Sequence, residues 1–195
     1  FESDMVHISA LIISDYSSKY NHWNASKSLG EWLKEEGVPG LFGIDTRLLT
    51  KHIREKGSML AKIEFDNSID FFDPNKSNLV EMVSCNKKII YGNGDTRILL
   101  IDCGVKFNII RYLQRFNATI IRVPWNHDIT NEDYDGLFIS NGPGDPSVCD
   151  KTINSLRYAI NRDKPIFGIC LGHQLLAIAA GASSYKLKFG HRSHN

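Results

Sequence analysis

From residue 97 onward, short apolar runs alternate with amphipathic helical stretches. This alternation is typical of a parallel sheet covered by helices on both faces, because strands buried on both faces carry nearly continuous apolar side chains. Ligands of such open sheets bind beyond the carboxyl ends of the strands, so functional residues are expected there. The pattern predicts strands at residues 98–102, 119–123, 136–140 and 166–169, and helices at residues 108–116 and 150–161.

The preceding part of the chain has a mixed pattern. An apolar stretch at residues 6–13 predicts a strand, and apolar residues at helical spacing predict a helix within residues 25–36. A second helix is expected between Asp45, which can cap its first turn, and Gly57, which can end it. Both element types therefore occur before the sheet begins.

A polar patch at residues 92–95 separates the two patterns. We therefore predict an α/β protein with two partial domains. A mixed α/β domain occupies residues 1–90, and an open, mostly parallel sheet domain occupies residues 97–195.

Charge and cysteine content exclude several classes of function. Lysine and arginine number 23 against 22 acidic residues, and the net charge is therefore +1. The sequence thus lacks the excess of positive charge that is typical of proteins that bind nucleic acid or an anionic membrane. No apolar run approaches the length needed to span a bilayer. Four scattered cysteines lack zinc-site spacing and are too few for a disulfide framework, which predicts no metal site and a reducing, cytoplasmic location. The sequence starts at Phe1 without a signal peptide, and we expect it to be an incomplete piece.

The strongest chemical signal is the G-x-C-x-G pattern at residues 168–172, between a buried strand and an apolar helix. A nucleophile on such a turn needs small neighbours, here Gly168 and Gly172, because its backbone is strained. The amides at the start of the helix favour a thiolate and can hold a developing oxyanion. Cys170 is therefore the candidate nucleophile. The alternative, that Cys170 is a small buried apolar residue, stays open because free cysteines commonly have that role.

A second signal follows the predicted strand at residues 136–140. The sequence SNGPGDP at residues 140–146 contains two glycines that let a polar substrate approach the backbone, and two prolines that fix the loop. An ordinary strand-to-helix turn is the alternative for this stretch alone. Together with the cysteine turn, it favours a substrate-binding loop.

At these residues the chain resembles the glutamine-hydrolysing small chain of carbamoyl phosphate synthetase, and its second part resembles a class I (triad) glutamine amidotransferase domain. Features at residues 22–23 and 123–125 resemble the fused eukaryotic form that begins pyrimidine synthesis. The segments that carry the resemblance are GIDTR at 43–47, DCGVK at 102–106, SNGPGDP at 140–146, FGICLGHQ at 167–174 and KFGHR at 188–192.

The resemblance implies a mechanism. Cys170 would attack the side-chain amide carbon of glutamine, form a thioester and release ammonia to a synthetase partner, either a large chain or a fused domain. The backbone amides of Leu171 and Gly144 would hold the oxyanion, and Gly142, Gly144, Leu171 and Gln174 would contact glutamine. ATP, magnesium and bicarbonate would belong to the partner, and no cofactor or metal is expected in this chain. The product would be carbamoyl phosphate for pyrimidine or arginine synthesis, and we favour cytosolic pyrimidine synthesis.

Three parts of the family pattern have no counterpart here: a general base, a glutamine-contacting serine in the amino-terminal domain and a later Asn-x-Gly-Phe contact loop. The resemblance implies a general base, a histidine followed two residues later by glutamate, and the sequence ends at Asn195 without it. His173 is expected to pack or form hydrogen bonds rather than replace that base. By itself, the chain is therefore expected to hydrolyse glutamine poorly.

Two other readings stay open. A catalytically silent amidotransferase-like module could dock on a partner or regulate it. A thiol hydrolase with the same sheet is less consistent with residues 43–56, which resemble the small-chain domain and have no expected role in a stand-alone hydrolase.

Overall fold

The computed structural model describes residues 2–3 and 5–187, and these residues form two compact units. The larger unit contains residues 72–185 and the smaller one mainly residues 5–71. The predicted domain ranges 1–90 and 97–195 stay a prediction. The segment before residue 97 is nevertheless tied to the sheet, because strand β3 (Ile89–Tyr91) pairs with strand β5 (Ala118–Pro124).

The larger unit is built on a five-stranded sheet in the order β3-β5-β4-β6-β7. Four strands run parallel and β3 pairs antiparallel with β5, so the predicted α/β class with a mostly parallel sheet is confirmed. The four parallel strands lie within two residues of the predicted ranges. They are β4 (Thr96–Asp102), β5, β6 (Gly136–Ile139) and β7 (Ile166–Gly168).

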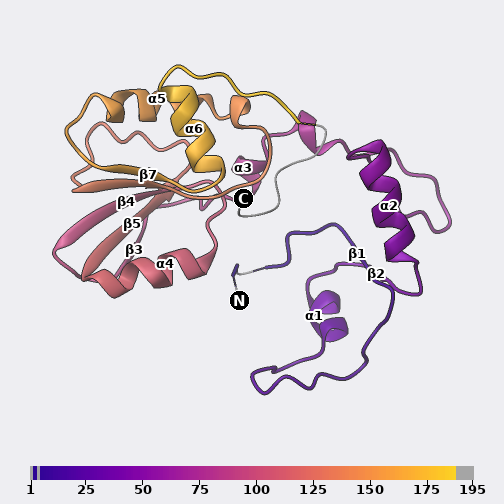
Figure 1. The fold of residues 1–195 in the computed structure, drawn as a ribbon. Helices are drawn as coiled ribbons and strands as arrows, with labels where there is room; N and C mark the ends of the chain where they lie inside the picture. The colour runs from indigo at the N-terminus through magenta and orange to yellow at the C-terminus, as the bar shows by residue number, and fades with distance from the viewer. Residues whose placement is uncertain (1, 4, 188–195) are drawn as a thin grey trace. The chain divides into compact units, whose positions relative to one another are not determined.

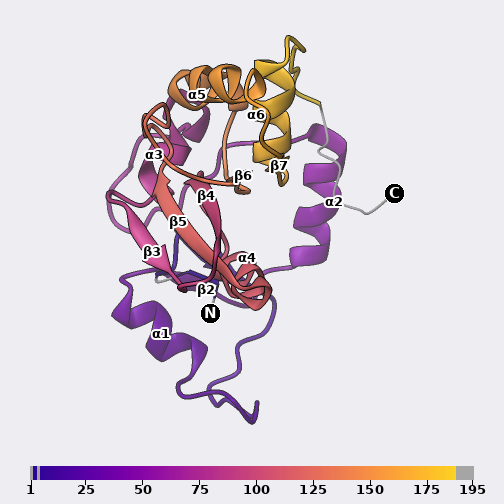
Figure 2. The same cartoon turned by 90° about the vertical axis from the view of Figure 1, so that its left-hand side faces the viewer.

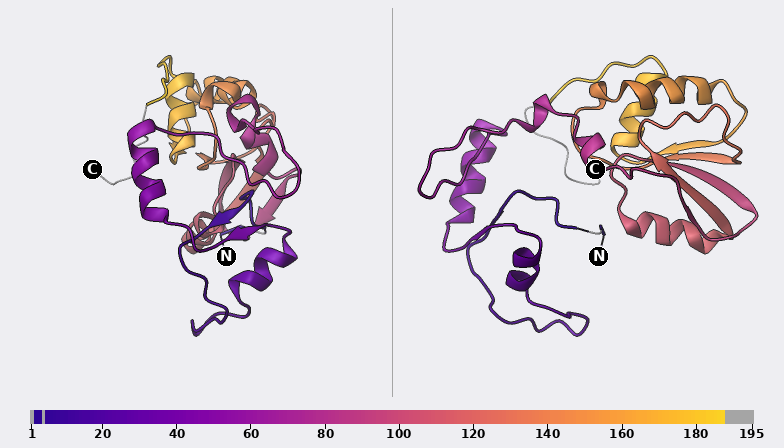
Figure 3. Two further views of the ribbon diagram at one scale, coloured as in Figure 1. Left: turned by 90° about the vertical axis from the view of Figure 1, so that its right-hand side faces the viewer. Right: turned by 180° about the vertical axis from the view of Figure 1, so that it is seen from behind.

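Helices cover both faces of this sheet. Helices α5 (Asp150–Ile160) and α6 (Leu171–Ala179) lie on one face, and α4 (Phe107–Leu113) lies on the other (Figure 1). Figures 2 and 3 show the same layers from other sides. The remaining elements of this unit are η1 (Pro74–Lys76), α3 (Leu79–Val83), η2 (Gln114–Phe116) and η3 (Pro146–Val148).

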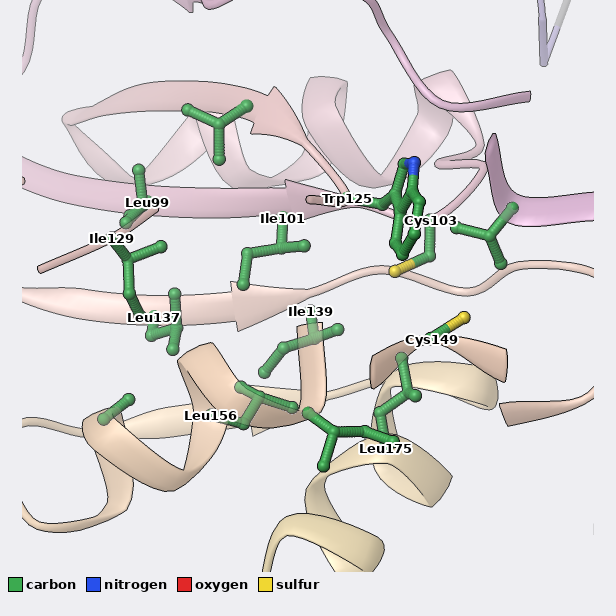
Figure 4. Close-up of a cluster of buried hydrophobic side chains, with 14 of the residues drawn as sticks. Leu99, Ile101, Cys103, Trp125, Ile129, Leu137, Ile139, Cys149, Leu156 and Leu175 are labelled. Atoms are coloured by element: carbon green, nitrogen blue, oxygen red, sulfur yellow. The ribbon is translucent and has the colours of Figure 1, made fainter. Parts of the chain in front are cut away.

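The main core fills the space between the sheet and the pair α5 and α6. Ile101 and Ile139 from the strands meet Leu156 and Leu175 from the helices, and all four are almost completely buried (Figure 4). Fully burying a side chain of this size contributes about 1.5–3 kcal/mol. A smaller cluster around Ile110 and Phe138 packs on the α4 face. The carboxyl ends of the strands are thereby held in fixed positions.

The smaller unit differs more from the sequence expectation. The predicted strand at 6–13 is reduced to β1 (Leu11–Ile12), which pairs with β2 (Gly40–Leu41). The predicted helix within 25–36 is α1 (Leu29–Glu35), which starts later because Ser28 and Glu31 form a capping box. Helix α2 (Thr46–Lys56) begins after Asp45 and ends before Gly57, as predicted.

Candidate active site

Cys170 lies on a sharp turn between β7 and α6. Its backbone has φ 52° and ψ −108°, and only Asn117 shares a positive φ among the other non-glycine residues that the structure describes. Strain of this kind persists only where the surrounding structure enforces it, and it is concentrated at functional sites. The Cys170 side chain is exposed. These two features are those expected of a nucleophile presented to a substrate.

Close backbone packing explains the glycines on either side of Cys170. A Cβ atom on Gly168 would lie 2.5 Å from the carbonyl carbon of Gly172, and one on Gly172 would lie 2.3 Å from the carbonyl oxygen of Ile139. The amide of Ile169 also donates to that Ile139 oxygen at 3.0 Å. The turn is therefore seated directly on the carboxyl end of β6.

The loop after β6 lies beside the first residue of α6. A Cβ atom on Gly142 would lie 2.7 Å from a Leu171 methyl carbon and 2.1 Å from the Cys103 carbonyl oxygen. Gly144 has φ 86°, which a residue with a side chain rarely adopts. The structure thus brings Gly142 next to Leu171, which is the residue that follows the candidate nucleophile Cys170.

The first turn of α6 presents donors and polar side chains. Leu171 is the first residue of α6, where helix N–H groups have no intrahelical partner, while the amide of Gln174 donates to the Cys170 carbonyl at 3.1 Å. The side chains of His173 and Gln174 are exposed. The expectations that Gln174 contacts glutamine and that His173 is not the base stay predictions.

The other three thiols are poor candidates for a nucleophile. Burial raises the pKa of Cys85 to about 11, with the negative charge of Asp102 adding to the effect. Burial also raises the pKa of Cys149 to about 11 and that of Cys103 further. Since the thiolate is the reactive form, these groups stay protonated and unreactive near neutral pH.

Sequence reasoning assigned no role to a buried ion pair at the ends of β4 and β5. The Asp102 carboxylate is completely buried and accepts hydrogen bonds from the Arg122 side chain at 2.6 and 2.8 Å. The signal was available in the sequence, because Asp102 directly follows the apolar run at residues 98–101 and Arg122 interrupts the apolar run at residues 120–123.

A separate groove of about 640 Å³ lies on the α4 face of the sheet. Its wall includes Phe167, which is 61% exposed, and Ile169, but none of the predicted site residues. We assign no ligand to it, because neither Cys170 nor any residue of the loop after β6 lines it.

Residues 2–3 and 5–187 contain no group of three or more histidine, cysteine, aspartate or glutamate side chains that could hold a metal ion. Within the same residues, no helix is both long and apolar enough to cross a bilayer.

Two family models match the sequence. Residues 99–195 match the model "Glutamine amidotransferase class-I", and residues 1–63 match "Carbamoyl-phosphate synthase small chain, CPSase domain". Only residues 64–98 lie outside both matches. The segment at 188–192, which contributed to the sequence resemblance, lies outside the residues that the structure describes.

Similar proteins are much longer than this chain. A multifunctional protein CAD from Squalus acanthias is 48% identical over 202 residues, and a multifunctional protein URA2 from Saccharomyces cerevisiae is 46% identical over 229. A mitochondrial carbamoyl-phosphate synthase from Homo sapiens, whose name specifies ammonia, is 47% identical over 198 residues. Each match covers all of this chain, which spans only 9%, 10% and 13% of the three proteins respectively.

Proposed function

The chain belongs to the class I glutamine amidotransferases of the carbamoyl-phosphate synthase small-chain kind, and on this premise we propose that it hydrolyses glutamine through Cys170. The observation that carries the proposal is the exposed Cys170 at a strained turn, beside the loop that contains Gly142. The proposal explains why the chain maintains this strain.

The proposed reaction has two steps. The Cys170 sulfur attacks the side-chain amide carbon of glutamine, a carbon–sulfur bond forms, and the carbon–nitrogen bond breaks as the nitrogen takes a proton and leaves as ammonia. Water then attacks the thioester carbonyl, which releases glutamate and returns the thiol. The general base that assists both steps is the histidine that the family resemblance implies, which is not among residues 1–195.

Negative charge develops on the carbonyl oxygen in both steps, first on that of the amide and then on that of the thioester. We propose that the N–H groups of Leu171 and Gly144 stabilise this charge, and that Gly142 and Gln174 help to hold the substrate. The position of Leu171 in the first turn of α6 and its proximity to Gly142 support this arrangement. Removing one donor of this kind typically lowers kcat by about 100- to 1000-fold.

The released ammonia would pass to a carbamoyl phosphate synthetase large chain or fused domain. Support comes from the small-chain match over residues 1–63 and from the relatives' names, which include carbamoyl-phosphate synthase. ATP and magnesium are assigned to that partner, and no cofactor is proposed for this chain. Pyrimidine synthesis in the cytoplasm is the proposed pathway and location, with arginine synthesis as the alternative.

A second candidate function is a silent docking or regulatory module. One relative, 47% identical, has a name that specifies ammonia, and an enzyme that uses free ammonia has no need for glutamine hydrolysis. The similarity to this relative is as high as that to the multifunctional proteins. Overall similarity therefore does not separate the two functions. The strained, exposed Cys170 favours the enzyme, because a docking surface has no need for a nucleophile in this conformation.

The experiment measures ammonia release from glutamine and labelling by a glutamine-like diazoketone, using the full-length natural protein. Cys170→Ser is the test variant, and Cys149→Ala is the matched control because its thiol is buried. We expect Cys170→Ser to lose both labelling and turnover, and Cys149→Ala to keep both. Equal labelling of wild type and Cys170→Ser, with no ammonia from either, would refute the enzyme and favour the docking module.

A further inference from the structure

The proposed oxyanion turn, residues 142–144, is bordered by a second turn that no catalytic role explains. We call residues 102–106, which follow β4, the support turn. The Gly142 backbone lies against the Cys103 carbonyl oxygen, 2.1 Å from where a Cβ would be. A Cβ on Gly104 would lie 3.2 Å from the Pro143 ring and 3.5 Å from the Gly142 Cα. The two turns are therefore in direct contact.

Two side chains before the oxyanion turn join it to the support turn. The Ser140 hydroxyl is completely buried, accepts from the Cys103 amide at 2.9 Å and donates to the Asn141 carbonyl at 2.8 Å. The Asn141 side chain donates to the Gly104 carbonyl at 3.0 Å and accepts from the Lys106 amide at 3.3 Å. Three of these hydrogen bonds thus connect Cys103, Gly104 and Lys106 of the support turn to the two residues that lead into the oxyanion turn.

Asp102 fixes the support turn from the other side. Its carboxylate accepts from the amides of Gly104 and Val105, each at 2.9 Å, and from the amide of Cys85 at 2.7 Å. Arg122 supplies the opposing charge from β5. Hydrogen bonds to a charged group are about twice as strong as neutral ones, so this turn is held more firmly than an ordinary loop.

The oxyanion turn needs external support of this kind. Pro143 fixes only its own φ, and glycines adopt many backbone conformations at low cost, so the residues of this turn do not by themselves fix the direction of the Gly144 amide. Stabilisation of an oxyanion depends on donors that are already aimed before the charge appears, because a donor that must reorganise contributes less. Contacts with a rigid neighbour provide that alignment.

We propose that Ser140 and Asn141 are positioning residues that lock the oxyanion turn onto the Asp102-anchored support turn, and so aim the Gly144 amide at the reacting carbonyl. This inference rests on the proposed glutaminase function. It adds residues that do not touch the substrate and act only through the alignment of a donor.

The test variant is Ser140→Ala, which removes one hydroxyl and leaves the Cys103 amide without this acceptor. The matched control is Thr119→Val, which removes a hydroxyl that donates at 2.7 Å to the Gly94 carbonyl near the opposite end of β5. In the full-length natural protein, kcat and KM for glutamine are measured together with the urea midpoint of each variant. Affinity for glutamate γ-semialdehyde, whose adduct with the thiol is tetrahedral like the intermediate, is measured beside them.

A misaligned donor lowers transition-state binding and leaves ground-state binding largely unchanged. Ser140→Ala should therefore lower kcat about tenfold or more and lower the affinity for the semialdehyde by a similar factor. The KM for glutamine should stay within about threefold of the wild-type value. Thr119→Val should lower the urea midpoint about as much as Ser140→Ala does, but should keep kcat within about twofold of the wild-type value. If Ser140→Ala fails to fold, Asn141→Ala, at a less buried position, should show the same separation of kcat from KM.

Each other outcome overturns the inference in a distinguishable way. If the wild type is active and folded Ser140→Ala keeps the wild-type kcat, only the positioning role is refuted. An unchanged kcat in Asn141→Ala has the same meaning if Ser140→Ala does not fold. An equal loss of kcat in Ser140→Ala and Thr119→Val assigns the effect to general stability and refutes it as well. A wild-type protein that releases no ammonia refutes the glutaminase function and the positioning role together.

Discussion

Gly172→Ala is the substitution whose effect on the site follows most directly from the structure. An added Cβ would lie 2.3 Å from the Ile139 carbonyl oxygen, 2.8 Å from its carbonyl carbon and 2.9 Å from its Cβ. All three atoms belong to the end of β6, which is almost completely buried and has no room to retreat. The start of α6 must therefore move away from the strand.

The size of that movement sets the expected loss of activity. An ordinary carbon–oxygen contact is about 3.3 Å, so the first turn of α6 has to shift by about 1 Å. A misplacement of about 1 Å at reacting groups can cost about 100-fold in rate, or about 2.7 kcal/mol. Overpacking in a tight core costs about 1–3 kcal/mol of stability. We expect Gly172→Ala to lower both kcat and the free energy of unfolding by these amounts.

The assay compares ammonia release and urea unfolding of Gly172→Ala with those of a glycine variant in β6, the strand against which Gly172 packs. Gly136 begins β6, and a Cβ there would lie 3.6 Å from its nearest neighbours, an ordinary contact. Gly136→Ala should therefore leave kcat unchanged. A Gly172→Ala protein with wild-type kcat and stability would refute the reasoning, because it would mean that α6 can move without disturbing Cys170.

Two further predictions concern buried ionisable groups. Arg122→Met leaves the Asp102 carboxylate buried without its cation and should cost about 3–5 kcal/mol in urea unfolding, whereas a loss below about 1 kcal/mol would contradict the importance of the pair. Burial raises the pKa of Cys85 and Cys149 to about 11 from an ordinary 9.0. The unfolded chain then loses these protons first, so the free energy of unfolding should fall as the pH rises from 9 to 11. Urea unfolding at pH 8 and pH 10 measures this fall, and an equally steep fall in Cys149→Ala would argue against the assignment to Cys149.

Local patterns predicted the elements whose boundaries depend on nearby residues. The apolar runs placed β4, β5 and β6 closely, because most of their side chains are buried, and they placed β7 equally closely although its Phe167 is exposed. The strand expected at 6–13 was largely wrong, since its pairing with β2 depends on a partner distant in sequence and extends over only two residues. Strand β3 was missed for a similar reason, as its three residues become a strand only by pairing with β5.

The sequence by itself determined the candidate nucleophile, the two turns that surround it and the family. Each of these depends on residue types at short spacing, such as the glycines on either side of Cys170. Only the tertiary structure decided what holds these turns in place. The bonds involved join Asp102 to Arg122, 20 residues away, and Cys103 to Ser140, 37 residues away. No local pattern encodes them, because they exist only when neighbouring parallel strands bring their carboxyl ends to one edge of the sheet.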